Sequence, residues 1–162
     1  MTRMTVAAWA GIGVAILVPI AGFAETATPD PRDVAAVQGC LKSQRGKELK
    51  GERCIGVVAD PCLKRARSTA DSNACADREL AVWDTMLNDT YRRLGEHLDE
   101  QQKTKARDMQ RAWIEARDKT CTFYWDYFQG TMASPMSSYC VVRETARRAM
   151  FLKFFLDESE GR

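Results

Sequence analysis

The stretch that decides the fold runs from residue 80 to residue 98 and reads LAVWDTMLNDTYRRLGEHL. Its large apolar side chains recur at steps of three and four residues. They are Leu80, Trp83, Leu87, Tyr91, Leu94 and Leu98. Side chains at this spacing lie on one face of an α-helix. Because a polar cluster at 68–73 precedes it, the pattern predicts a long amphipathic helix over about 72–98.

Two further long helices are expected toward the C-terminus. After a polar run at 99–105, a second apolar stripe follows helical spacing. It contains Met109, Ala112, Trp113, Ala116, Cys121, Tyr124 and Phe128. A loop is expected over 130–138, which is rich in glycine, serine and proline, and helical spacing resumes from Val142 to Leu156. We expect the first two long helices to pack antiparallel and the charged tail at 157–162 to fray.

The N-terminal part predicts only short elements. Asp30 is a suitable N-cap and Pro31 a suitable first residue for a helix running toward Gly51. Residues 54–59 fit a short strand or a buried turn, and a brief helix is expected over 62–66. The fold class is therefore all-α: a small helical bundle of three long helices plus short N-terminal helical elements, stapled by disulfides.

The first 24 residues predict a cleaved signal peptide. Arg3 is followed by an uncharged apolar stretch from Val6 to Phe23, and small residues precede a cut after Ala24. An uncleaved membrane anchor is the alternative, because the stretch approaches the length of a spanning helix. Cleavage would leave residues 25–162 as a single domain without a stable membrane span, periplasmic or secreted.

Six cysteines follow this segment, an even number typical of a disulfide framework in an oxidising compartment. We favour a Cys121–Cys140 bridge, which would close the 130–138 loop and fix the angle between two helices. The nearest-neighbour choices for the others are Cys40 with Cys54 and Cys62 with Cys75, and the sequence does not rank them against other pairings. A zinc site is the alternative, but the chain has no CxxC pair and a single histidine. No metal or cofactor is predicted.

Charge and motifs exclude several function classes. Without Arg3 the chain holds 23 basic and 22 acidic side chains, a balance that favours neither nucleic acid nor an anionic membrane as partner. No nucleophile elbow, zinc-protease motif, P-loop or dinucleotide turn is present. His97 and carboxylates such as Glu79 and Asp84 are typical of a solvated helix face. We therefore expect a binding protein and not an enzyme, with a wall hydrolase as the least favoured alternative.

A polar and aromatic set on the three long helices is the candidate binding site. It comprises Trp83, Asp84, Asn88, Tyr91, Arg111, Trp113, Arg117 and Arg143. Asp84 and Asn88 are one helical turn apart, as are Trp113 and Arg117. In one interpretation Arg117 and Asp84 tie adjacent helices together while the aromatic rings fill the core. In the other, the exposed parts of these residues form a binding groove.

The same residues carry a resemblance to a known family. The patterns are WDxxLNxxY over 83–91, QRAWIxxRDxxC over 110–121, Gly130-Thr131, Cys140, and TxxR from Thr145. Together with Cys75 and Glu79 they resemble the lysozyme inhibitor LprI-like family over about 62–152, leaving 30–61 as an N-terminal extension.

The resemblance implies an exported, helical, cysteine-paired protein that binds lysozyme and protects the cell wall. Tyr91, Arg117 and Trp125 are candidate anchors for such an interface. Lysozymes are commonly basic, and a local acidic patch would attract one. That patch would contain Asp84, Asp89, Glu96, Asp99 and Glu100. The alternative is an envelope accessory module that binds a small anionic or peptidoglycan-derived ligand, or an endogenous envelope protein.

Overall fold

Three long helices form the body of the protein, as expected. A computed structural model describes residues 28–44 and 51–161, and the predicted signal peptide lies outside these residues. The long helices are α3 (Thr69–Glu96), α4 (Glu100–Tyr127) and α5 (Ala133–Ser159). The shorter elements are α1 (Pro31–Ser43), α2 (Ala59–Leu63) and the 3₁₀ turns η1 (Glu52–Cys54) and η2 (Gly130–Met132). No strand occurs in the described residues, so the fold is all-α.

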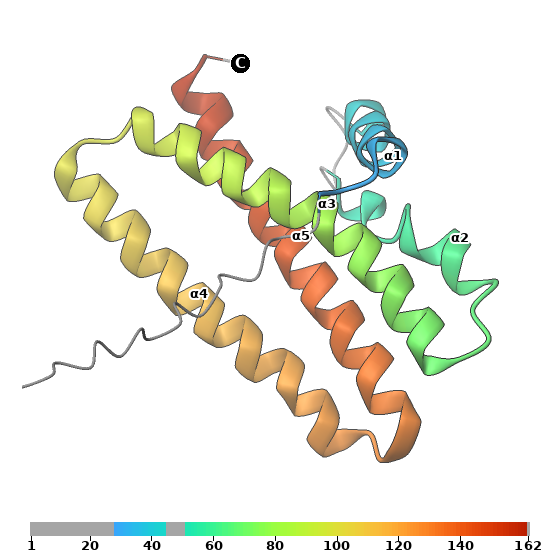
Figure 1. The fold of residues 1–162 in the computed structure, drawn as a ribbon. Coiled ribbons are helices and arrows are strands. Elements are labelled where there is room, and N and C mark those ends of the chain that lie inside the picture. Colours follow the sequence, from blue (N-terminus) through green and yellow to red (C-terminus); the bar gives the residue numbers. More distant parts are fainter. Residues whose placement is uncertain (1–27, 45–50, 162) are drawn as a thin grey trace, which may run out of the picture.

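Helix α5 is the central element, and both other long helices contact it (Figure 1). Asn73 donates to Ser134 Oγ at 2.7 Å, and Arg93 donates to Glu160 at 2.7 Å. These bonds join the starts and the ends of α3 and α5, so the two helices run parallel. α4 runs antiparallel to α5 and is bridged to it by Cys121–Cys140, with Cα atoms 5.4 Å apart. α3 and α4 are therefore antiparallel to each other, as expected, but α5 forms the main interface with each.

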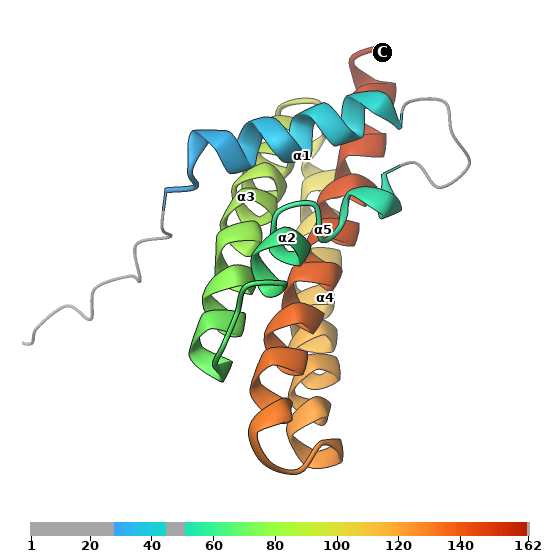
Figure 2. The same cartoon turned by 90° about the vertical axis from the view of Figure 1, so that its right-hand side faces the viewer.

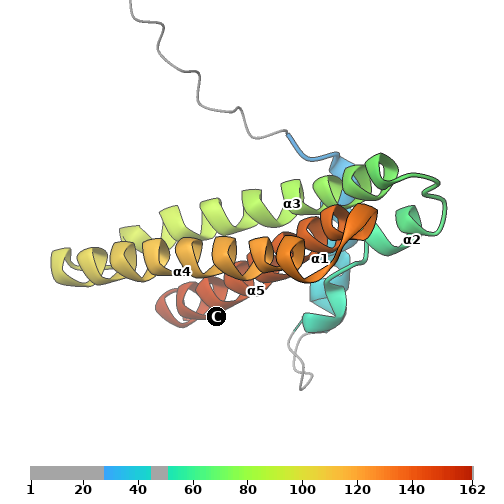
Figure 3. The same ribbon diagram turned by 90° about the horizontal axis from the view of Figure 1, so that it is seen from below.

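The short N-terminal elements lie across one face of the α3–α5 pair. Figure 2 shows α1 crossing over both helices, where Val37 enters the core and Arg78 on α3 holds Asp33 at 2.6 Å. Figure 3 shows α2 at the end of the molecule opposite the α3–α4 turn. Cys40–Cys54 and Cys62–Cys75 fasten this region. All three bridges therefore join cysteines that are neighbours in sequence.

Several predicted boundaries were wrong, and capping explains two of them. Asp99 and Gln102 form a reciprocal capping box, so α4 begins within the polar run 99–105 and not after it. Pro135 lies in the first turn of α5, where proline is tolerated, so the expected loop over 130–138 is mostly helix. Gly51 does not end α1, which stops at Ser43, but caps η1 with a positive φ of 101°. Of residues 54–59, which we expected to form a short strand or a buried turn, 55–58 form turns between η1 and α2.

Candidate binding site

The eight residues predicted as a site separate into a core residue, surface pairs and an interhelical cluster. Trp83 belongs to the core and is 0 % exposed. Its indole N–H donates to Glu79 Oε1 at 2.9 Å. Trp83 therefore fits the interpretation in which the aromatic rings fill the core.

Glu79, which we expected on a solvated face, is fully buried and organises the 54–59 turn. Besides the indole, its carboxylate accepts from the backbone N–H groups of Gly56 at 2.6 Å, Val58 at 3.0 Å and Ala59 at 2.8 Å. Gly56 has a φ of 97°, and a Cβ there would lie 2.8 Å from the Tyr139 hydroxyl. Four donors around one carboxylate satisfy a buried acid. Glu79 is thus a structural residue that fixes the turn to α3.

The polar members Asn88, Arg117 and Arg143 make separate contacts. Asn88 donates to Asp84 at 3.0 Å on the surface of α3. Arg117 pairs with its neighbour Asp118 at 2.8 Å, so the expected Arg117–Asp84 tie is absent from the described contacts. Arg143 donates to the Tyr124 hydroxyl at 3.0 Å, and this hydrogen bond raises the pKa of Arg143. Arg143 therefore joins α5 to α4.

One group of side chains does converge between α4 and α5, and we name it the Trp113 cluster. It comprises Gln110, Trp113, Arg117, Arg148 and Phe151. The Cζ atoms of Arg117 and Arg148 lie 5.0 Å and 5.5 Å from the centre of the Trp113 ring. Arg148 also lies 5.2 Å from the centre of the Phe151 ring, and its Nε donates to Gln110 at 2.9 Å. Cation–π contacts and one amide thus hold the Arg148 guanidinium.

Arg148 is the residue that sequence reasoning missed. Only 8 % of it is exposed, and its Nη2 is buried without a hydrogen-bond partner. Burial lowers the pKa of Arg148 from its ordinary value. The signal for it was the TxxR pattern, whose fourth position is Arg148. The preceding residue, Arg147, is exposed and pairs with Glu52 and Glu144.

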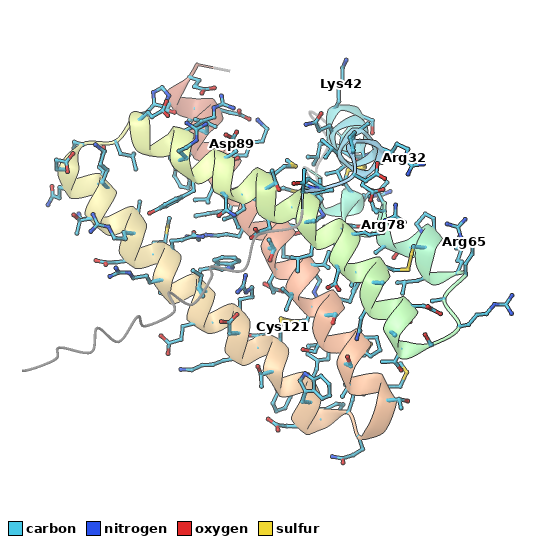
Figure 4. All side chains as sticks on the ribbon, in the orientation of Figure 1. Arg32, Lys42, Arg65, Arg78, Asp89 and Cys121 are labelled. Atoms are coloured by element: carbon cyan, nitrogen blue, oxygen red, sulfur yellow. A yellow bond between two sulfur atoms is a disulfide. The ribbon has the colours of Figure 1, made fainter. Side chains whose placement is uncertain are left out.

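The outer surface of α4 is the second notable feature. Of its 28 residues only Cys121 is buried. Figure 4 shows Cys121 on the side of α4 that faces α5. Several large apolar side chains project from the helix toward solvent. They are Ile114 at 40 %, Phe123 at 60 %, Trp125 at 53 % and Tyr127 at 68 % exposed. Arg111 is also exposed.

The predicted acidic patch is largely neutralised. Arg92 pairs with Asp89 at 2.8 Å and with Glu96 at 2.9 Å. Asp99 caps α4, and Glu100 pairs with Lys103. Between α3 and α4 lies a pocket of about 200 Å³ with basic and apolar walls. It is lined by Tyr91, Arg92, Leu94, Gly95, Leu98, Lys103, Ala106 and Arg107.

Two other kinds of site are absent from the described ranges. No group of three or more histidine, cysteine, aspartate or glutamate side chains there could hold a metal ion. None of the helices described has both the length and the apolar character required to span a bilayer.

Comparison with known proteins gives a consistent result. An uncharacterized protein of Rhizobium meliloti is 29 % identical over 116 residues, which cover 63 % of this chain and 84 % of that protein. No solved structure matches the chain. The family model described as lysozyme inhibitor LprI matches residues 62–152, more than half of the chain, and spans α3, α4 and most of α5. The chain therefore belongs to the lysozyme inhibitor LprI family.

Proposed function

We propose that this protein is exported and inhibits lysozyme by binding it through the exposed apolar side chains of α4. The observation that carries the proposal is the exposure of Ile114, Phe123, Trp125 and Tyr127 on a helix that buries only Cys121. Family membership supplies the class of partner, an enzyme bound by an inhibitor, and three disulfides fit an oxidising compartment.

The exposed apolar side chains of α4 have the properties of protein-binding residues, with Ile114 and Trp125 beside the stripe of Cys121 and with Phe123 and Tyr127 on the opposite side of the helix. Aromatic side chains dominate the energy of interfaces because they bury large areas with few rotatable bonds. Here the rings of Phe123 and Tyr127 lie 6.1 Å apart, and Trp125 is one helical turn from the Cys121–Cys140 bridge. The bridge holds this end of α4 against α5 before any partner arrives. Binding would therefore cost little conformational entropy.

Charge is expected to contribute little to this interaction. The acidic residues that would steer a basic lysozyme are engaged by Arg92 and Lys103 or by the cap of α4. We expect association to depend weakly on salt and the lifetime of the complex to depend on the aromatic anchors.

The test is a lytic assay in which the oxidised protein slows lysozyme, compared between two single substitutions. Trp125→Ala removes an exposed ring from α4, and Phe155→Ala, the control, removes a ring that is 43 % exposed from α5. We expect Trp125→Ala to weaken inhibition by about 30-fold, the effect of losing a hot-spot residue, and Phe155→Ala to leave it unchanged. Equal inhibition by all three proteins, or none by the unsubstituted one at micromolar concentration, would contradict the proposal.

The other predicted role is an accessory module for a small anionic or peptidoglycan-derived ligand. This role does not require the exposed aromatic side chains of α4, but it requires a positively charged side chain that has no negatively charged partner in the protein. Among the residues first assigned to it, Trp83 is buried and Asp84 is engaged by Asn88. Arg148 meets the requirement instead, since it is buried and forms no ion pair within the described ranges.

A further inference from the structure

The Trp113 cluster contains a buried positive charge without a counter-charge. A buried guanidinium is ordinarily paired with a carboxylate, because removing an ion from water is costly. Arg148 has no carboxylate oxygen within 4.0 Å in the part of the chain described, and its Nη2 donates to nothing. Gln110 accepts from the Nε only. The Nη2 group of Arg148 is therefore a buried hydrogen-bond donor without an acceptor.

The surroundings of Arg148 hold the guanidinium without neutralising it. Trp113 and Phe151 lie 5.5 Å and 5.2 Å from its Cζ, so aromatic rings restrict its position. The hydrogen bond to Gln110 fixes its rotation. A second cation, Arg117, lies over the same Trp113 ring at 5.0 Å. Restricted donors between apolar walls are the arrangement that recognises a planar anion.

The local charge indicates which anion fits. Arg117 is paired with Asp118, so Arg148 supplies the one unbalanced charge of the cluster. A singly charged group would balance it, whereas a phosphate dianion would leave an excess of negative charge. The planar fork of arginine matches the two oxygens of a carboxylate.

We propose that the Trp113 cluster is a carboxylate-binding site in which Arg148 is the receptor and Arg117 and Trp113 form the wall. This inference rests on the second predicted role, ligand binding, and not on inhibition of lysozyme. The carboxylate belongs either to a peptide C-terminus or to an acidic side chain. Both sources present a carboxylate to Arg148, and they differ in the group to which that carboxylate is attached.

Tryptophan indole N–H signals in nuclear magnetic resonance test the site directly. Within the described residues, Trp83 is buried, Trp113 lies in the cluster and Trp125 is exposed on α4, so two signals serve as internal controls. The oxidised protein, produced by export of the full chain, is titrated with acetate at constant ionic strength against chloride. We expect the Trp113 signal to shift saturably with acetate alone, while the other two stay in place.

Substitutions then assign the shift to Arg148. Arg148→Met removes the charge and is expected to abolish the shift. Arg148→Lys keeps the charge but loses the planar fork, and it is expected to weaken binding by about 5-fold or more. The control is Arg147→Gln, which removes the neighbouring exposed arginine and should change nothing at Trp113. A Trp113 signal that does not move, or moves equally in the Arg148 variants, would overturn the proposal.

Folding measurements separate a ligand receptor from a structural arginine. A receptor cation is unpaired without ligand, so Arg148→Met should keep or raise the urea midpoint of the free protein. A midpoint that falls for both Arg148→Met and Arg148→Lys would show that Arg148 is structural, and it would overturn the proposal if acetate also fails to shift Trp113.

Two peptides distinguish the sources of the carboxylate. Acetyl-Ala-Ala with a free C-terminus offers a terminal carboxylate, and acetyl-Ala-Glu-amide offers only a side-chain carboxylate. A shift of Trp113 with the first points to a peptide C-terminus, and a shift with the second points to an acidic protein segment. A shift with acetyl-Ala-Gln-amide, which has no carboxylate, would count against the proposal.

Discussion

Helices α3 and α4 are equal in length, but they differ in how many of their residues are buried. Each has 28 residues, yet α3 buries eight of them and α4 buries one. α3 is covered by α1, α2, the 54–59 turn and α5, whereas α4 has α5 as its main contact. The difference teaches that two amphipathic helices of one protein serve separate purposes. α3 is the scaffold, and α4 is a surface element held in place at a few points.

The sharpest test of this contrast applies the same substitution to a buried and an exposed glutamate. Glu79→Ala on α3 leaves three backbone N–H groups and an indole without their acceptor. We expect it to lower the free energy of unfolding by about 3 to 5 kcal/mol.

The matched substitution is Glu115→Ala on α4, where the side chain is 67 % exposed and paired with Lys119. We expect a change within about 0.5 kcal/mol. Urea denaturation of the oxidised proteins measures both, and similar effects of the two substitutions would contradict the division between scaffold and surface element.

Removing the bridge between α4 and α5 should loosen one helix and spare the other. Replacing both Cys121 and Cys140 by alanine opens a loop with a sequence separation of 19. The expected loss is about 3 kcal/mol in the chain-entropy model. Hydrogen exchange should accelerate in α4 more than in α3. Equal acceleration in both helices would show that α4 is an integral part of the core.

The smallest expected effect concerns the titration of Tyr139 on α5 at alkaline pH. Burial, and then the Asp60 carboxylate, raise the pKa of Tyr139 above its ordinary value of about 10. The folded state binds the Tyr139 proton more tightly than the unfolded state does. This difference contributes fully to stability below pH about 10, and the contribution is lost as pH rises through the pKa of Tyr139 in the folded state. Tyr139→Phe should therefore make the decline of stability above pH 10 less steep, measured by urea midpoints. An unchanged decline would argue against a buried hydroxyl at this position.

The helices could be predicted because their signals are local. Leu80, Leu87 and Leu94 mark one face of α3 through spacing alone, and α4 shows a similar stripe. Boundaries were less accurate, since they depend on caps such as the Asp99–Gln102 box, which lies in a polar run that resembles a loop.

The candidate site could be predicted only in part. Trp113, Arg117 and the exposed Trp125 were identified from the sequence, but spacing along one helix cannot tell which face a neighbouring helix will cover. Trp83 therefore appeared equivalent to Trp113, although one is buried against Glu79 and the other stacks on two arginines.

The sequence by itself determined the all-α class, the three long helices and an even set of cysteines, because helical periodicity and residue counts need no knowledge of contacts. Only the tertiary structure decided which long helix is central, that Glu79 is buried and that Arg148 forms no ion pair within the described residues. These properties depend on residues more than twenty positions apart in the chain, such as Glu79 with Gly56 and Arg148 with Gln110. Such contacts arise from the packing of α3 and α4 around α5, which no local pattern encodes.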